Sequence, residues 1–296
     1  MPNWKSRLLS LSLGLLAAGA VAAAPADKPA QKSAAPAPDT DVRLYALDCG
    51  HLDFKSLGMF SDTGEYDGRP GRILTPCFLI RHPQGWMLWD AGLGDRYAQQ
   101  ATGVDAFGGL VHVQVPVTLA AQLAILNLAP KDIRVVAFAD LHEDHVGNAN
   151  LFAKTATWVV NDKELAWAKS DPPPLRVDAG LFSGVESADV KRIDGDFDVF
   201  GDGRVIILKA PGLTPGHQVL LLRLKKTGAV LLAGGLYPLR ESRGQRRVPA
   251  TSTSRADALA SMERIEKIAA NQKARVVAQG DPADFAALPK FPACLN

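Results

Sequence analysis

The chain has 296 residues, of which 47% are hydrophobic and 22% charged, and its formal net charge is +2. These values are typical of a folded protein and suit one domain of up to about 250 residues or two small ones. Basic residues are dispersed apart from a patch at residues 240–247, and aromatic residues do not interleave with them. We therefore interpret that patch as a solvated loop and expect no nucleic-acid partner.

Residues 1–24 have the pattern of an export signal. Lys5 and Arg7 precede an apolar run over residues 8–21, and three alanines at residues 22–24 suit cleavage by a signal peptidase. The run is short for a membrane span, which favours a cleaved signal over a retained anchor. We expect an exported protein, periplasmic or secreted, with no stable membrane insertion after cleavage.

Residues 25–41 are rich in Ala and Pro and lack an apolar period. This composition predicts a flexible linker. The folded domain is therefore expected over residues 42–296.

The folded domain shows strand-like apolar runs separated by turns and by helical patterns. Strands are predicted at residues 42–47, 72–81, 86–90, 133–139, 157–160, 205–210, 219–224, 229–233 and 275–278. Helices are predicted at residues 118–128, 161–168 and 254–270, with Asn161 and Ser254 as N-caps of the last two. Because strands occur both in hairpins and between helices, we expect mixed β-sheets with helices outside.

The chain contains three cysteines, Cys49, Cys77 and Cys294, and none belongs to a CxxC pair. A thiolate zinc site is therefore unsupported, whereas one disulfide suits an oxidising compartment. The sequence does not choose among the three pairings. A bond to Cys294 would fix the C-terminus.

A cluster of His and Asp follows the strand predicted at residues 133–139. It comprises Asp140, His142, Asp144 and His145, and a distant candidate, His217, lies in the segment TPGH. Imidazole and carboxylate side chains at this spacing suit Zn²⁺ or a similar divalent ion. The alternative is a polar loop in which the short acids accept hydrogen bonds from backbone amides.

These residues belong to segments that resemble the metallo-β-lactamase superfamily, and within it the N-acyl-homoserine lactonase-like branch. The segments are FLIRHPQGWMLWDAGL, LHEDHVGNANLF, LKAPGLTPGHQVLLL and LLAGGLYP. The resemblance implies an α/β fold, an αββα sandwich of two mixed β-sheets flanked by helices. It places the metal site in loops at one edge of the sandwich.

The family's metal-binding pattern, HxHxDH followed by a distant His, a bridging Asp and a last His, is matched only in part. The matching positions are His142, Asp144, His145 and His217. The positions that differ are Asp140 for the first His, Gly235 for the bridging Asp and Gly280 for the last His. Without the bridging carboxylate, a second metal has few ligands.

The resemblance implies an exported, metal-dependent hydrolase of lactone, ester or amide bonds that acts on a small-molecule substrate. We expect about one Zn²⁺ or similar ion per chain, held by Asp140, His142 and His217, with a metal-bound water as nucleophile. Asp144 would be the catalytic residue that orients this water or accepts its proton, and His145 would be a weak further ligand. The alternative is a non-catalytic binding or accessory protein on a degenerate metallo-β-lactamase fold.

Several other polar residues have predicted roles. We expect Asp90 to anchor a loop through backbone hydrogen bonds, and Asp281 to lie near the site without binding metal. Tyr237 either points at substrate or packs in its loop. The histidines His51, His82 and His112 are expected to be structural, and pocket walls are expected from residues 103–116 and 172–187.

Overall fold

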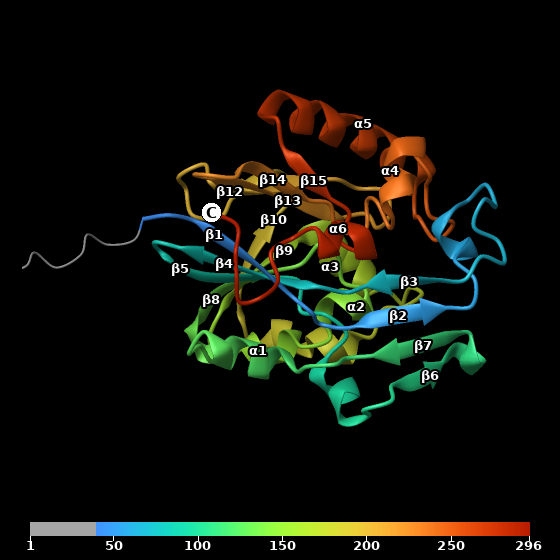
Figure 1. Cartoon of the computed structure of the whole chain (residues 1–296), viewed down its shortest axis with the longest axis horizontal. Coiled ribbons are helices and arrows are strands. Elements are labelled where there is room, and N and C mark those ends of the chain that lie inside the picture. The colour runs from blue at the N-terminus through green and yellow to red at the C-terminus, as the bar shows by residue number, and fades with distance from the viewer. Residues whose placement is uncertain (1–39) are drawn as a thin grey trace, which may run out of the picture. The chain divides into compact units, whose positions relative to one another are not determined.

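Two β-sheets packed face to face form the centre of the computed structural model, which describes residues 40–296 (Figure 1). The predicted export signal, and all but the end of the predicted linker, lie outside these residues. One sheet has the strand order β1-β4-β5-β8-β9-β10. Its strands are β1 (Arg43–Leu47), β4 (Cys77–His82), β5 (Gly85–Trp89), β8 (Ile133–Ala137), β9 (Thr157–Asn161) and β10 (Asp189–Ile193). The β1, β4 and β5 strands are antiparallel, whereas β5, β8, β9 and β10 run parallel.

The second sheet has the order β11-β12-β13-β14-β15. Its strands are β11 (Phe197–Asp198), β12 (Val205–Lys209), β13 (Gln218–Leu224), β14 (Gly228–Leu232) and β15 (Arg275–Val277). Only the pair β14–β15 is parallel. Both sheets are therefore mixed, as expected.

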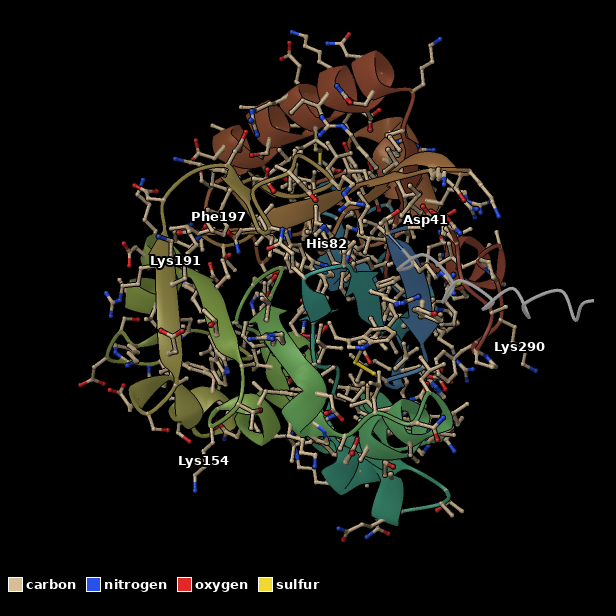
Figure 2. All side chains as sticks on the ribbon, turned by 90° about the vertical axis from the view of Figure 1, so that its left-hand side faces the viewer. Asp41, His82, Lys154, Lys191, Phe197 and Lys290 are labelled. Carbon is tan, nitrogen blue, oxygen red and sulfur yellow. A yellow bond between two sulfur atoms is a disulfide. The ribbon has the colours of Figure 1, made fainter. Side chains whose placement is uncertain are left out.

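Alternating side chains give each sheet two apolar faces. On β13, Leu220 and Leu222 pack in the core between the two sheets, whereas Val219 and Leu221 pack in the core that includes the buried side of α5 (Arg255–Gln272). The outer face of the first sheet packs with α1 (Leu119–Ile125) and α3 (Asp162–Ala168). This confirms the predicted αββα sandwich, and charged side chains such as Lys154 and Lys290 point away from it (Figure 2).

The predicted helix caps are present. The hydroxyl of Ser254 accepts a hydrogen bond from the backbone amide of Asp257, and the side chain of Asn161 accepts from the amides of Lys163 and Glu164. Such caps satisfy amide donors that have no partner within the helix.

A small third sheet was not predicted. It has the order β3-β2-β7-β6 and consists of β2 (His51–Phe54), β3 (Gly71–Leu74), β6 (Val104–Ala106) and β7 (Val111–Gln114). The single strand predicted at residues 72–81 is wrong, because the segment divides at Thr75 and Pro76 into β3 and β4. Proline has no amide hydrogen to donate to a ladder, which explains the break.

The remaining elements are short. They are the helices α2 (Glu143–Val146), α4 (Arg240–Gln245) and α6 (Pro282–Ala286), and 3-10 turns at Gly58–Phe60, Asp95–Gln99, Phe107–Gly109, Pro130–Asp132, Ala149–Phe152 and Ala179–Glu186. The basic patch at residues 240–247 therefore begins with a helix and is not the expected loop. Arg240 pairs with Asp284 and Arg243 with Glu266. Within residues 40–296, no helix combines the length and apolar character that a bilayer span requires.

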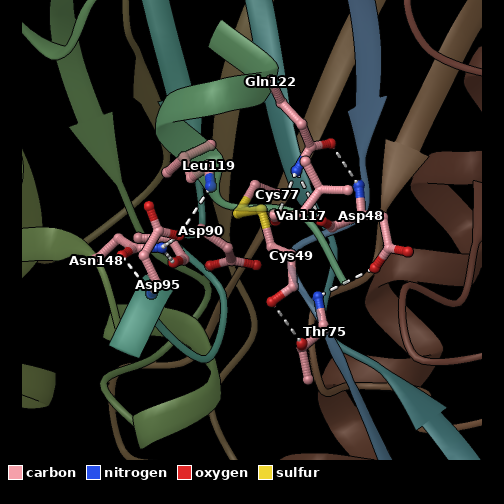
Figure 3. The surroundings of a disulfide bond; sticks show 12 residues. Asp48, Cys49, Thr75, Cys77, Asp90, Asp95, Val117, Leu119, Gln122 and Asn148 are labelled. Atoms are coloured by element: carbon pink, nitrogen blue, oxygen red, sulfur yellow. Dashed lines mark hydrogen bonds between the residues drawn. A yellow bond between two sulfur atoms is a disulfide. The ribbon is translucent and has the colours of Figure 1, made fainter. Parts of the chain in front are cut away.

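The disulfide joins Cys49 to Cys77, and Cys294 is free (Figure 3). The hypothesis of a bond to Cys294 is therefore wrong. Backbone hydrogen bonds between Leu44 and Leu295 fix the C-terminus instead.

Candidate functional site

The His and Asp cluster follows β8 and lies where the loops between β8 and α2 and between β12 and β13 meet. Asp140 is buried, and its Oδ1 atom accepts hydrogen bonds from the backbone amide of His142 at 3.0 Å and from Nδ1 of that residue at 2.9 Å. The two predicted ligands thus bind each other. Their spacing of i and i+2 allows both bonds to form within one short turn.

The second carboxylate oxygen of Asp140 has no such partner. Its Oδ2 atom is buried and makes no hydrogen bond to any residue of the described part of the chain. Nε2 of His145 lies 3.9 Å from this oxygen. Burial opposes ionisation of Asp140, but His145 and His142 outweigh it and hold the pKa of this carboxyl well below its ordinary value.

His145 lies among three carboxylates. Its Nδ1 atom is 3.0 Å from Oδ2 of Asp90, and its Nε2 atom is 3.9 Å from Asp140 and from Asp144. Burial lowers the pKa of His145, but these carboxylates raise it well above the ordinary value. The contact of His145 with Asp90 was not predicted.

Asp90 has the predicted structural role. Its Oδ1 atom accepts a hydrogen bond from the amide of Ala139 at 2.7 Å, and its Oδ2 atom accepts one from Nε2 of Gln279 at 2.9 Å. Gln279 also accepts from Nε1 of Trp89 and from the amide of Gly234. These bonds join the ends of β5, β8 and β15 behind the site.

An arginine that was not predicted, with a side chain only 14% exposed, lies beside Asp144. Nη2 of Arg176 donates to Oδ1 of Asp144 at 2.6 Å, and Nε of Arg176 is 3.6 Å from Oε1 of Glu143. Burial raises the pKa of Asp144, but Arg176 and then His145 outweigh it, so that the pKa is lowered overall. The sequence did contain a signal for this residue, because Arg176 is the single charged residue of the segment PPPLRV in a predicted pocket wall.

His217 is fully buried, and both of its ring nitrogens are engaged. Nδ1 donates to the carbonyl of Ala210 at 3.0 Å, and Nε2 accepts from the amide of Gly235 at 3.0 Å. Burial lowers the pKa of His217, which keeps the ring neutral. Neither ring nitrogen of His217 is therefore available to a metal ion as the side chain is placed, and Gly235, at the position of the bridging Asp, occupies Nε2.

The metal expected from the resemblance does not fit these side chains as they are placed. Within residues 40–296, no group of three or more His, Cys, Asp or Glu side chains is arranged to hold a metal ion. Each imidazole has a protein partner, and Asp144 is paired with Arg176. A single ion at Asp140, His142 and His217 would require Nε2 of His217 to release the amide of Gly235, so this site stays a prediction.

Two cavities adjoin the cluster. The smaller one, here called the recess, has a volume of about 60 Å³ and is lined in part by Asp140, Asp144, His145, Arg176, Gly235 and Gly280. The larger one, here called the apolar cavity, has a volume of about 440 Å³ and is lined in part by Leu52, Phe54, Met59, Val113, Leu175 and Arg176. Arg176 thus lines both cavities, and residues from both predicted wall segments contribute to the apolar cavity.

The other polar residues lie away from the recess. Tyr237 is buried in the core that includes the inner side of α5, where its hydroxyl donates to Oε1 of Glu266 at 2.9 Å, so it does not point at a substrate. Asp281 caps α6. His82 is 2.9 Å from Asp202, and His112 is 2.8 Å from Asp105. These contacts support structural roles. His82 is labelled in Figure 2, in which the left-hand side of Figure 1 faces the viewer.

Comparison with known proteins agrees with this architecture. The model of the metallo-beta-lactamase superfamily matches residues 70–231, and this chain belongs to that superfamily. It is 31% identical to the N-acyl homoserine lactonase AttM of Azorhizobium caulinodans over 86% of this chain and 98% of that protein. It is 27% identical to an N-acyl homoserine lactonase of a Bacillus species over 79% of this chain and 91% of that protein.

Solved structures of lactonases share the fold. An N-acyl homoserine lactone hydrolase with N-hexanoyl-L-homoserine at its catalytic metal centre has a TM-score of 0.74 and 22% identity, covering 86% of this chain and 100% of that one. The dizinc quorum-quenching lactonase AidC has a TM-score of 0.62 and 17% identity, covering 86% of this chain and 89% of that one. At these identities the likeness concerns the fold.

Proposed function

We propose that this chain binds small acylated lactones in its two adjoining cavities. The relatives that share most of its length are N-acyl homoserine lactonases, which supports this class of ligand. A recess that contains the charged groups of Asp144 and Arg176, beside an apolar cavity, suits a ligand with a polar ring and an acyl tail.

Binding without hydrolysis is the function that the geometry favours. The observation that carries it is the ion pair of Arg176 with Asp144 inside the recess. Arg176 supplies positive charge beside Asp144, and the carboxylates of Asp140 and Asp90 raise the pKa of His145, so that charge compensation is available without a metal. The short contact of this ion pair makes metal binding at Asp144 costly, because the arginine would have to move.

Hydrolysis with one divalent ion is the second candidate function. It is favoured by the unpartnered Oδ2 atom of Asp140, since buried carboxylate oxygens without a hydrogen bond are rare. Asp140, His142 and His217 would hold the ion, which would polarise a carbonyl and lower the pKa of a bound water. Asp144 would need to leave Arg176 in order to accept a proton.

We also propose that the chain is exported to the periplasm or the medium. The basic and apolar pattern of residues 1–24 supports this proposal. Expression in a bacterial host with and without residues 1–24, followed by fractionation, tests it. Retention of the full chain in the cytoplasm would contradict it.

One set of measurements separates the two candidate functions. The mature chain is incubated with zinc, dialysed, and analysed for bound metal, for affinity to N-decanoyl-L-homoserine lactone by calorimetry, and for ring opening by chromatography. Binding of the lactone by a metal-free protein without turnover supports the first function. About one metal per chain with turnover, both lost in Asp140→Ala and His142→Ala, supports the second, and failure to bind any acylated lactone rejects the proposal.

A further inference from the structure

An exposed segment, here called the arm (residues 171–176), lies in the connection between α3 and the 3-10 turn at Ala179–Glu186. It begins with Asp171 and three prolines, and Leu175 near its end is 66% exposed. The last residue of the arm turns the other way, because the side chain of Arg176 is only 14% exposed. The arm thus lies on the surface and carries a guanidinium group inward.

The inward end of the arm is held by α2. Nη2 of Arg176 donates to Oδ1 of Asp144 at 2.6 Å, and Nε of Arg176 lies 3.6 Å from Oε1 of Glu143. The carbonyl of Arg176 also accepts a hydrogen bond from the amide of Glu143 at 2.9 Å. The side chain and the backbone of Arg176 are therefore both fixed to neighbouring residues of α2, and the bond to Asp144 is strengthened by charge.

Arg176 lies at the boundary between the two cavities. Among the residues that the structure describes, it is the one that belongs to the lining of both the recess and the apolar cavity. Its partner Asp144 lines the recess, whereas Leu175 and Glu143 line the apolar cavity. Displacement of this one side chain would therefore join a space of about 60 Å³ to one of about 440 Å³.

The backbone of Arg176 is in a conformation that depends on these contacts. Its φ is 62°, in the left-handed region, where the Cβ atom of an L-residue is crowded by the backbone. A residue stays in this region where the surrounding contacts hold it there. Without the ion pair to Asp144, the backbone bond to Glu143 would have to oppose this strain, so we expect the arm to move outward.

We propose that Arg176 is a gate between the recess and the apolar cavity. While Arg176 pairs with Asp144 the two cavities are separate, and when the pair opens the arm moves outward and the cavities become continuous. A molecule long enough to occupy both cavities has to break this ion pair first, so the gate limits the rate at which it enters. The gate follows from contacts within the protein and does not depend on the proposed function.

Limited digestion of the mature chain with trypsin, read by mass spectrometry, tests whether the ion pair holds the arm. Trypsin must bind the arginine side chain, so the bond between residues 176 and 177 should resist cleavage while the gate is closed. We expect Asp144→Asn to be cleaved there about tenfold faster than the wild type. Cleavage after Lys154, which is exposed, is the internal reference for unfolding of the whole domain.

Asp178→Asn is the matched control for this experiment. It makes the same chemical change two residues beyond Arg176 and keeps the oxygen that accepts from the amide of Gly180. We expect cleavage after Arg176 to stay at the wild-type rate in this variant. Rapid cleavage after Arg176 in the wild type, or equal rates in the wild type and a folded Asp144→Asn variant, would overturn the proposal.

Arg176→Ala is a second variant that leaves Asp144 in place. Hydrogen exchange at the amide of Glu143 should become about tenfold faster, because its acceptor is the carbonyl of Arg176. Lys169→Ala, which removes an ion pair with Glu186 before the arm, should leave this exchange unchanged.

The same Arg176→Ala variant tests whether the cavities become joined. His142 lines the recess, and its side chain is 11% exposed. We expect diethyl pyrocarbonate to modify His142 at least about threefold faster in the variant, measured relative to the exposed His112, since the reagent can then also enter through the apolar cavity. Unchanged exchange at Glu143 or an unchanged rate at His142 would contradict the gate.

Discussion

Gly235 and Gly280 both stand where the superfamily pattern has a metal ligand, yet their surroundings differ. A Cβ at Gly235 would meet only the flexible end of Leu213 at a close distance. A Cβ at Gly280 would lie 2.8 Å from the backbone carbonyl of Pro238 and 3.1 Å from Cγ2 of Ile73. The Gly235 position is thus filled by the end of a flexible side chain, whereas the Gly280 position is closed mainly by backbone. The two positions therefore differ in how readily they accept a side chain.

The largest expected effect on stability comes from Gln279, the residue before Gly280. In Gln279→Ala, the indole N–H of Trp89 and the amide of Gly234 lose their partner in the protein interior, and Oδ2 of Asp90 keeps only its contact with His145. We expect the free energy of unfolding to fall by about 3 kcal/mol, because buried polar groups are left unpaired. Urea denaturation measures this change. Gln272→Ala, on the exposed side of α5, is the control and should change stability by less than about 0.5 kcal/mol.

A matched pair of alanine substitutions tests the comparison itself. Gly280→Ala should lower the free energy of unfolding by about 2 kcal/mol, because the added methyl group overlaps backbone that cannot move easily. Gly235→Ala should cost less than about 1 kcal/mol, because a side-chain rotation relieves its overlap. Equal costs for the two variants in urea denaturation would show that the two glycines have equivalent surroundings.

The loops beside Gly235 should give the protein a pH-dependent stability that comes from Glu164. This carboxyl accepts hydrogen bonds from the amides of Leu141 and Gly216 and from the hydroxyl of Thr214, so it joins the loops that carry Asp140 and His217. Burial, and then the charge of Asp140, raise its pKa from 4.5 to about 7. The folded state therefore holds this proton more tightly than the unfolded state does.

Because of this difference, the stability that protonated Glu164 contributes is present below pH 4.5 and is lost as pH rises to about 7. We expect a decrease of about 1–2 kcal/mol over this range, smaller than the shift alone implies because Glu164 interacts with Asp140. Urea denaturation at several pH values measures it, with Glu164→Gln as the comparison. A difference between the two proteins that does not vary with pH would contradict this assignment.

Local sequence signals predicted much of the fold. The apolar runs and the caps at Asn161 and Ser254 act over a few residues, and apart from the run at residues 72–81 they appear where they were expected. The third sheet escaped prediction because β2, β3, β6 and β7 are short and pair across distant segments. Propensity carries little information about such pairings.

The site was harder to predict than the fold. Spacing placed Asp140, His142, Asp144 and His145 together, and the structure confirms that they line one recess. Their bonding depends on residues far away in the sequence, since Arg176 pairs with Asp144 and Asp90 contacts His145. No local pattern shows that a guanidinium enters this position, so the sequence predicts the cluster but not its internal ion pairs.

The disulfide has a consequence for the handling of the protein. It closes a segment of the chain that contains β2 and β3, and β2 supplies Leu52 and Phe54 to the wall of the apolar cavity. Such a cross-link typically adds about 3 kcal/mol of stability, and it does not form in a reducing cytoplasm. Material purified from reducing cells would therefore have a loosened wall at the tail site. A ligand-binding assay therefore reports on the native cavity only if the disulfide between Cys49 and Cys77 has formed in the purified protein.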